Sequence, residues 1–444
     1  MVKNRAGSLI AAVGLSLFVS ACSGDMANDT GKGSKGEGSV PQTAKDSPPK
    51  PVSLTLVSIS PKEEMEAVYL EPLRKKYPHF DIRYIQNLKA DGTTIPELLA
   101  TGVKFDLYTN SRGGFEETLL DYDLKYDMSD LIRKHNVDIG HLEPTAIASM
   151  RQMFEGKIYG LPVKMNSLLL YYNKTLFDTF GVSYPKDGMS WAETLELANK
   201  MTRSDGKTSN YGIGSHGTGA MIGWNPYSIP LVDGNKRTPT IQTDERWKTL
   251  IQAVLLNPVF TKAYKEIGKI PDWSSFSKDR NVAMLLYTAA APLALTKDFS
   301  SLDWDMTSFP VLPGLAEVGS QVSPNYFGVT SLSENKDAAM EAVKFWTSLD
   351  YFVENSQGGT LMASRAKEVR EALGTKSPFP NKNWKAVTYY PFAPLAPTTN
   401  ADSKVRSVYE KHMNSLLSGA VDLNTGLRTM AEESLKTINE QPKP

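Results

Sequence analysis

The chain of 444 residues carries 49 Lys and Arg against 49 Asp and Glu, and its one cysteine is Cys22. The even charge and the lack of a basic block give no electrostatic footprint for nucleic acid. A single cysteine excludes an intramolecular disulfide, so the folded part must be stabilised by its own cores. About 390 residues after the N-terminal region suffice for two domains.

The N-terminus has the pattern of an export signal. Lys3 and Arg5 precede an apolar run over 6–21. A positive start, a short apolar run and small residues before a cleavage point are typical of a secretory signal peptide. The run is short for a membrane-spanning helix, which needs about 20 apolar residues. We therefore expect an exported protein with a signal peptide over 1–21.

Cys22 follows this run directly, in the segment Val19-Ser20-Ala21-Cys22. The segment resembles the lipobox of bacterial lipoproteins, in which the cysteine is lipidated and becomes the mature N-terminus. The resemblance implies a lipid anchor on the outer face of the cytoplasmic membrane, where two or more acyl chains hold a protein firmly. The alternative is an ordinary signal peptide with an incidental cysteine.

Residues 23–52 contain no aromatic residue, no Ile and no Leu. A stretch dominated by Gly, Ser, Pro and Lys buries too little apolar surface to offset the entropy lost on ordering. We expect the lipidated cysteine and a disordered linker to occupy 22–52.

The folded part begins with alternating strands and helices. Apolar patterns predict a strand over 53–60, a helix over 61–76, a strand over 79–85, a short helix over 95–100 and a strand over 104–110. Strands separated by helices indicate right-handed βαβ units and a mostly parallel sheet. Because ligands bind beyond the carboxyl ends of such strands, we expect a site at the loops after Ser58 and Tyr108.

The stretch over 156–202 contains a distinctive order of residues: Gly-Lys-x-Tyr-Gly-x-Pro, then Tyr-Asn-Lys-x-x-Phe, then Gly, then Trp-x-Glu-x-x-x-x-Ala. They are Gly156, Lys157, Tyr159, Gly160, Pro162, Tyr172, Asn173, Lys174, Phe177, Gly181, Trp191, Glu193 and Ala198. Ser190 and Glu193 match a capping box at the last helix. The set resembles the family 1 extracellular solute-binding proteins of bacterial ABC importers, which include maltose- and oligosaccharide-binding proteins.

Three later segments follow in the order that this family has. Residues 280–295 resemble its helix-then-strand segment, 309–314 its Pro-Leu-Pro-Gly strand, and 326–349 its returning strand and helix. Apolar positions from Ala338 to Trp346 fit an amphipathic helix. The resemblance covers about residues 53–440.

The resemblance implies an α/β fold of the periplasmic-binding-protein type, with two lobes, a hinge and an interlobe cleft. We expect the chain to cross between the lobes near Val163, near Val311 and at 357–360. The N-lobe would comprise 53–163 plus 312–357, and the C-lobe 164–311 plus 358–440.

A search for catalytic residues finds no constellation. The five histidines form no His-x-x-x-His pair and stand beside no carboxylate cluster at metal-ligand spacing. Residues 212–219 are glycine-rich but lack the Gly-Lys-Ser/Thr ending of a phosphate loop, so a mobile loop or bulge is the better interpretation. We expect no enzyme activity, no metal and no cofactor.

Aromatic and amide residues concentrate in apparent loops, as a hydroxyl-rich ligand requires. Glycine and proline around Trp224 and Tyr227 favour a cleft loop there. The resemblance adds the loops after the first and third strands, and Asn166. The predicted ligand-binding residues are Ser60, Lys62, Glu63, Asn110, Ser111, Arg112, Asn166, Trp224, Asn225, Tyr227, Tyr287, Asn325, Tyr326 and Tyr390.

Two departures from the family pattern argue against a long maltodextrin-like ligand. Asn110 stands where maltose-binding relatives have an aromatic residue. Small residues follow Tyr287 where the family often places a Trp as a stacking platform. Tyr287, or a Trp elsewhere, would have to serve instead.

The sequence thus predicts a lipid-anchored extracellular receptor that captures a small solute, preferably a sugar, and delivers it to ABC permease subunits. We expect a monomer. Three alternatives stay open. The first is a non-sugar solute, either a peptide or an organic anion, which Arg112 and Lys62 would suit. The second is a sensory or structural lipoprotein. The third is an anchored hydrolase, which needs a paired acid and base that no readable spacing provides.

Overall fold

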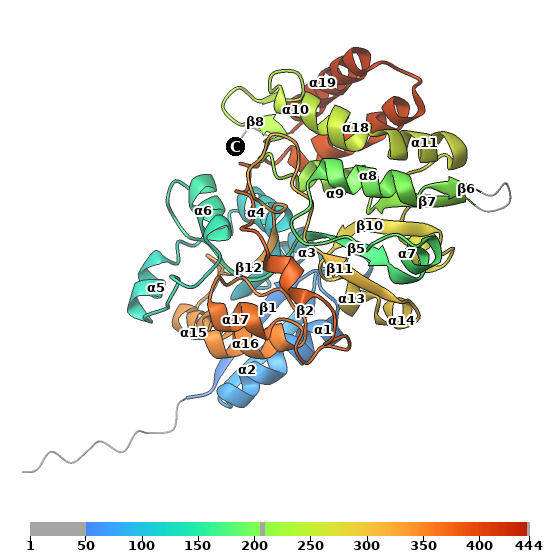
Figure 1. The fold of residues 1–444 in the computed structure, drawn as a ribbon. Helices are drawn as coiled ribbons and strands as arrows, with labels where there is room; N and C mark the ends of the chain where they lie inside the picture. Colours follow the sequence, from blue (N-terminus) through green and yellow to red (C-terminus); the bar gives the residue numbers. More distant parts are fainter. Residues whose placement is uncertain (1–49, 205–208, 442–444) are drawn as a thin grey trace, which may run out of the picture. The chain divides into compact units, whose positions relative to one another are not determined.

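The computed structural model describes residues 50–204 and 209–441. Within them the fold is α/β, as predicted, with two five-stranded sheets and a two-stranded ribbon (Figure 1). The predicted signal peptide over 1–21, the lipidation of Cys22 and nearly all of the linker lie outside the described residues. In the described ranges, no helix combines the length and the apolar character needed to cross a membrane.

The first sheet has the strand order β2-β1-β3-β12-β4. Its strands are β1 (Val52–Ser58), β2 (Phe80–Gln86), β3 (Leu107–Ser111), β4 (Leu161–Asn166) and β12 (Ser323–Val329). β1 is parallel to β2 and β3, whereas β12 is antiparallel to β3 and β4. The first three predicted strands are confirmed. Because Ser58 lies opposite Thr109, β1 and β3 end side by side at the same edge.

The helices around this sheet, apart from the 3-10 turn over 89–91, contribute residues to a shared hydrophobic core. They are α1 (Lys62–Met65), the π-helical η1 (Glu66–Leu70), α2 (Glu71–Lys76), the 3-10 turn η2 (Lys89–Asp91), α3 (Ile95–Ala100), α4 (Arg112–Asp121), α5 (Ser129–Lys134), α6 (Pro144–Met153), α15 (Lys336–Trp346), α16 (Leu349–Gln357) and α17 (Lys367–Ala372). Tyr69, Phe327 and Trp346 form an aromatic cluster in this core. The predicted strand and helix over 326–349 are confirmed by β12 and α15.

The second sheet has the order β11-β5-β10-β7-β6. Its strands are β5 (Leu168–Asn173), β6 (Arg203–Ser204), β7 (Ser209–Ser215), β10 (Val282–Thr288) and β11 (Trp304–Thr307). β10 is parallel to β7 and antiparallel to β5. The ribbon joins β8 (Val232–Asp233) to β9 (Thr238–Pro239).

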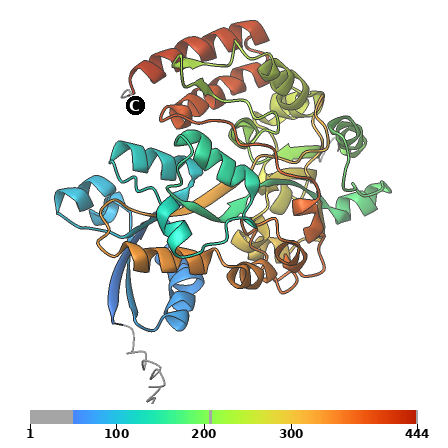
Figure 2. The ribbon, with the colours of Figure 1, turned by 90° about the vertical axis from the view of Figure 1, so that its left-hand side faces the viewer.

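Two hydrophobic clusters pack on this sheet, one around Trp191 and Trp247 and the other around Tyr171, Phe299 and Trp304. The helices here are α7 (Lys174–Phe180), α8 (Trp191–Met201), α9 (Thr218–Gly223), α10 (Arg246–Thr249), the π-helical η3 (Leu250–Leu255), α11 (Pro258–Ile267), α12 (Trp273–Ser277), α13 (Ala291–Ala294), α14 (Thr296–Ser300), the 3-10 helix η4 (Trp384–Thr388), α18 (Asp402–Ser418) and α19 (Leu423–Asn439). α18 lies against α19, α9 and α11, in red beside green and yellow in Figure 2.

Two predicted segments are wrong in detail. Over 280–295 the chain forms β10 first and α13 after it, not a helix and then a strand, because β10 is buried between two strands and Pro292 starts the helix. The strand expected over 309–314 makes only one isolated bridge, at Val311. Pro310 and Pro313 lack the N–H that a ladder requires.

In the glycine-rich segment 212–219, only residues 216–217 form a loop, because 212–215 belong to β7 and α9 begins at Thr218. Gly212 and Gly214 lie inside β7. A Cβ at Gly212 would collide with the carbonyl of Ala198 in α8, and one at Gly214 would collide with the carbonyl of Pro271. Glycine stands at both positions because other backbone segments approach the strand closely.

The chain passes between the sheets at three places. Ser167 alone separates β4 from β5, residues 308–322 lead from β11 to β12, and a third passage lies between α17 at the first sheet and η4 at the second. Leu312 packs in a core of the second sheet and Val369 in the core of the first. The lobe boundaries given above stay a prediction.

Candidate functional site

A cavity of about 450 Å³ is lined by residues from elements of the first sheet and its helices and from elements that pack on the second sheet. One wall is the end of β3 and the start of α4, residues 110–117. The facing wall is residues 222–224 at the end of α9, and the segment 396–406 that leads into α18 closes a third side. The volume lies within the roughly 300–1,000 Å³ typical of small-molecule sites. The carboxyl end of β3 thus contributes to the cavity, where an α/β sheet is expected to bind a ligand.

The turn from β3 into α4 is held by Asn110. Its side-chain Nδ2 donates to Tyr108 Oη at 3.0 Å, and its Oδ1 accepts from the Ser111 backbone N–H at 2.8 Å. Gly114 in the first turn of α4 leaves space for this amide, which a Cβ would overlap. Asn110 therefore lines the cavity while most of its hydrogen-bonding capacity supports the backbone.

Arg112 and Glu116 form a buried ion pair on α4, with Nε and Oε1 3.2 Å apart and side chains 11 % and 4 % exposed. The pair also bridges to the segment before α18. The Arg112 guanidinium donates to the Ala396 carbonyl at 2.5 Å, and the Thr398 hydroxyl donates to Glu116 Oε2 at 2.6 Å. Burial raises the pKa of the Glu116 carboxyl, while Arg112 and Thr398 act against that rise. The charge of Arg112 is thus already neutralised inside the protein.

Asp402 begins α18 beside this bridge. Its Oδ1 accepts from the Thr399 backbone N–H at 2.9 Å and from the Thr399 hydroxyl at 2.7 Å. Burial raises the pKa of Asp402 to about 6, although the bonds from Thr399 and the charge of Arg112 oppose the rise. Burial and the neighbouring Asp121 likewise raise the pKa of Glu117, against a smaller lowering by Lys404.

The facing wall is largely apolar. Ile222, Ile229 and Leu231 are buried, and Trp224 is half-buried against the same core. No hydrogen bond of the Trp224 indole N–H is present among the described residues. At Gly223 a Cβ would lie 2.8 Å from the Arg406 guanidinium, so the glycine lets that side chain reach the cavity. An aromatic face beside polar groups suits a ligand with both C–H and hydroxyl surfaces.

The cavity brings together four of the fourteen predicted ligand-binding residues: Asn110, Ser111, Arg112 and Trp224. The loop after β1 contributes Ile59 instead of its predicted members. Ser60 donates its backbone N–H to Ser58 Oγ at 3.1 Å, and Lys62 and Glu63 are exposed at the start of α1.

Three other predicted residues hold backbone segments together. Asn166 Oδ1 accepts from the Ser167 and Ala290 backbone N–H groups at 3.0 and 3.1 Å, at the passage between the sheets. Asn225 is buried and donates to the Ile222 carbonyl, and Tyr227 donates its hydroxyl to the Pro313 carbonyl, both at 2.7 Å. None of the three lines the cavity.

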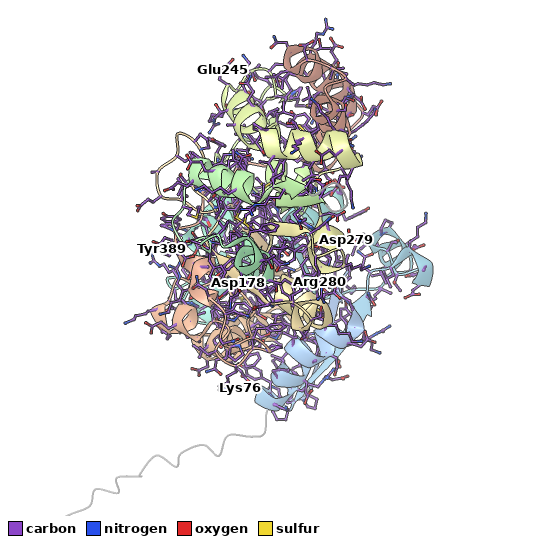
Figure 3. All side chains as sticks on the ribbon, turned by 45° about the vertical axis from the view of Figure 1, so that its right-hand side comes forward. Lys76, Asp178, Glu245, Asp279, Arg280 and Tyr389 are labelled. Atoms are coloured by element: carbon purple, nitrogen blue, oxygen red, sulfur yellow. The ribbon has the colours of Figure 1, made fainter. Side chains whose placement is uncertain are left out.

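Tyr326 is buried in the core of the first sheet, as its neighbour Phe327 is, and its hydroxyl donates to the Ala146 carbonyl at 2.8 Å. Asn325 is opposite Ser111 across the ladder, outside the cavity lining. Tyr390 lies against Tyr389, which projects from the surface (Figure 3).

Tyr287 belongs to a separate aromatic cluster at the end of β10. Its ring centroid is 4.2 Å from that of His216 and 5.3 Å from that of Trp273. This cluster is not part of the cavity lining.

Sequence reasoning missed the third side of the cavity. Thr398, Asp402 and Arg406 line that side, and none was predicted as a binding residue; Glu116 on the α4 wall was not predicted as one either. A usable signal was present, since Thr399 and Asp402 have capping-box spacing before a long helix. That spacing predicts where a helix begins. Only the three-dimensional fold shows that the start of this helix lies across the cavity from α4.

Within the described ranges, no group of three His, Cys, Asp or Glu side chains could hold a metal ion. The polar side chains of the cavity can form hydrogen bonds or carry charge, so they can orient a bound solute.

Two sheets joined by three passages, with a cavity lined from both, define a two-lobe binding protein of the periplasmic-binding-protein type. Residues 59–351 match the family of bacterial extracellular solute-binding proteins, and the chain belongs to that family.

Similar proteins agree with this placement. A curated protein of Brucella abortus (strain 2308), named as a binding protein, is 22 % identical over 295 residues, 64 % of this chain and 68 % of that protein. A sugar transporter from Rhizobium etli, solved in an open conformation, has a TM-score of 0.70 at 21 % identity and covers 88 % of this chain and 100 % of its own. The cyclic α-maltosyl-1,6-maltose binding protein from Arthrobacter globiformis has a TM-score of 0.69 at 14 % identity, with the same coverage.

Proposed function

We propose that the protein is a lipid-anchored extracellular receptor that captures a small carbohydrate in the cavity and delivers it to an ABC permease, without chemistry. The observation that carries the proposal is the lining of the cavity. Trp224 offers an aromatic face, and Ser111, Ser323 and Ser403 offer hydroxyl groups around it. Carbohydrates need this combination of a stacking surface and hydrogen-bonding groups.

The name of the Arthrobacter protein supports the carbohydrate class, although 14 % identity carries over the fold alone. The α4 wall of the cavity argues against an organic anion. Arg112 is neutralised by Glu116 and hydrogen-bonded to Ala396, and Lys62 is not part of the lining. An anionic solute would therefore find no free cation on the α4 wall.

A thermal-shift screen over neutral, amino and acidic sugars tests the proposal. A ligand that binds only the native state raises stability by RT ln(1 + [L]/Kd), so one sugar class should raise the melting temperature in a concentration-dependent way. The control is the Trp224→Ala variant, in which that shift should shrink. Stabilisation by peptides or by no carbohydrate at all would overturn the sugar assignment.

The anchor rests on Cys22 and needs its own test. Metabolic labelling with a fatty-acid analogue should label the wild-type protein and leave Cys22→Ser unlabelled, with that variant released from the membrane fraction. Equal labelling of both proteins would contradict lipidation at Cys22. Delivery to a permease predicts that the protein co-purifies with ABC permease subunits from its own cells, and this is measured with the solute present and absent.

A further inference from the structure

The cavity lining contains more acidic than basic side chains, and only some of the acidic ones form ion pairs in the described structure. Among the described residues, five charged side chains line the cavity: Arg112, Arg406, Glu116, Glu117 and Asp402. Carboxylates therefore outnumber guanidinium groups. A net negative lining already distinguishes the cavity from the rest of a chain whose charge is balanced.

Both cations already have carboxylate partners. Arg112 Nε lies 3.2 Å from Glu116 Oε1, and Arg406 Nε lies 3.9 Å from Glu410 Oε1 on the next turn of α18. Arg112 also donates to the Ala396 carbonyl. Arg112 is thus not left as a free counter-charge for a bound anion, whereas the pairing of Arg406 with Glu410 is long and half-exposed.

Two of the carboxyl groups have no such partner. In the described part of the chain, no Lys, Arg or His lies within ion-pair distance of Glu117 or Asp402. Asp402 Oδ1 accepts from Thr399, whereas no hydrogen bond to Oδ2 is present among the described residues. Burial raises the pKa of both groups, as expected for carboxylates that lack a counter-charge. The charged residues near these two carboxyl groups are Arg112, Glu116, Asp121 and Lys404. With these neighbours the pKa values of Glu117 and Asp402 stay raised.

We infer that the cavity selects solutes that carry an amino group, namely amine-bearing sugars, over their neutral and acidic counterparts. The inference rests on the proposed function, because it names the substrate class of the same site. An ammonium group supplies the positive charge that Glu117 and Asp402 lack, and hydrogen bonds between ionised partners are about twice as strong as neutral ones. A carboxylate on the sugar would instead add a like charge, which discriminates against uronates.

The facing wall fits the rest of such a ligand. Trp224 can cover a pyranose ring, and its aromatic face also attracts a nearby cation. Ser111 and Ser403 remain for sugar hydroxyls. The same cavity therefore offers a platform for the ring and negative charge for the amine.

Isothermal titration calorimetry near neutral pH tests the inference. Glucosamine, galactosamine and mannosamine are each compared with the neutral parent sugar, the N-acetyl derivative and the uronate, as monosaccharides and as β-1,4-linked disaccharides. At least one amine should bind about tenfold or more tightly than its neutral parent, and the ratio should fall as salt is added. The uronates should not bind.

Two substitutions localise the effect. Glu117→Gln and Asp402→Asn should each reduce the amine preference, which is the ratio of the neutral sugar's Kd to the amine's, several-fold. Asp402→Asn keeps an acceptor oxygen for Thr399, so α18 can still begin there. Asp121→Asn removes a nearby charge from α4 outside the lining and should keep the wild-type preference.

The outcomes separate this inference from the proposed function. Neutral sugars that bind as tightly as amines, or a preference for uronates, overturn the inference and leave the sugar receptor standing. A preference for amines that survives in both lining variants places the recognising charge elsewhere and also overturns it. Binding by none of the sugars overturns both, and Glu117→Gln keeps the test valid should Asp402→Asn fail to fold.

Discussion

The charged side chains of Arg112 and Glu116 on the α4 wall pair with each other, whereas Asp402 at the start of α18 has no ion-pair partner in the described structure. On α4, Arg112 and Glu116 satisfy each other and hold Ala396 and Thr398. At the start of α18, the side-chain hydrogen bonds that Asp402 accepts within the described residues all come from Thr399 and reach Oδ1 alone. The comparison teaches that a charged residue in a cleft is not by that fact a ligand-binding residue. The groups that remain for a solute are those that the fold leaves unpaired.

The largest expected effect on stability comes from breaking the Arg112–Glu116 ion pair on the α4 wall. Glu116→Ala leaves the Arg112 guanidinium buried without its counter-charge and the Thr398 hydroxyl without its acceptor. We expect a loss of about 3–5 kcal/mol in the free energy of unfolding, measured by urea denaturation.

The next residue on the same helix is the matched control. Glu117→Ala removes a carboxyl with no ion pair in the described structure and should change the free energy of unfolding by no more than about 0.5 kcal/mol. Equal losses at the two positions would mean that the bridge to Thr398 contributes nothing beyond helix stability.

A second prediction concerns the pH dependence of the unpaired carboxyl. The pKa of Asp402 is about 6 in the folded state, against 3.8 as the ordinary value. The folded state therefore binds more protons than the unfolded state between these values, so stability falls as the pH rises through that window. Its full extent is roughly 3 kcal/mol or less, at about 1.4 kcal/mol per pKa unit.

Asp402→Asn removes this titration. Denaturation midpoints of the variant and the wild type, measured from pH 4 to pH 7, should diverge in favour of the variant as the pH rises. Parallel curves would show that the pKa of the Asp402 carboxyl is not raised in the folded state. A wild type that gains on the variant with rising pH would show that Asp402 has a counter-charge after all.

The sequence was sufficient for the part of the fold that depends on local patterns. The strands β1, β2 and β3 and the capping box of α8 follow from apolar runs and from Ser190 and Glu193. The order of motifs was sufficient for the family, which residues 59–351 show.

The site was harder to predict, because it depends on which elements meet. The strand-end rule and the family pattern pointed to Asn110, Ser111 and Arg112, which line the cavity; their role in binding stays a prediction. They could not show that Asn110 is used by the backbone turn or that Arg112 is neutralised by Glu116. Asp402, nearly three hundred residues further along the chain, has no local signal beyond a helix cap.

A third prediction addresses the apolar wall. Trp224→Ala removes the aromatic face from the cavity and should weaken binding of the preferred sugar about 10- to 100-fold, equivalent to roughly 1.4–2.7 kcal/mol. The affinity is measured by calorimetry, and Trp224→Phe should recover part of it because a smaller aromatic face remains. Unchanged affinity in Trp224→Ala would move the stacking surface away from this wall.

The smallest expected effect distinguishes the two aromatic regions of the second sheet. Tyr287 packs with His216 and Trp273 outside the cavity lining, although the family pattern places a stacking platform near this position. Tyr287→Ala should therefore change the affinity for a monosaccharide less than about twofold, whereas Trp224→Ala lowers it strongly. Comparing both variants on a monosaccharide and on a trisaccharide separates two arrangements of the ligand. If Tyr287→Ala weakens only the trisaccharide, the ligand extends from the cavity to the end of β10. If it weakens the monosaccharide as well, the primary sugar lies at that cluster, and the α4 wall is not where the solute is recognised.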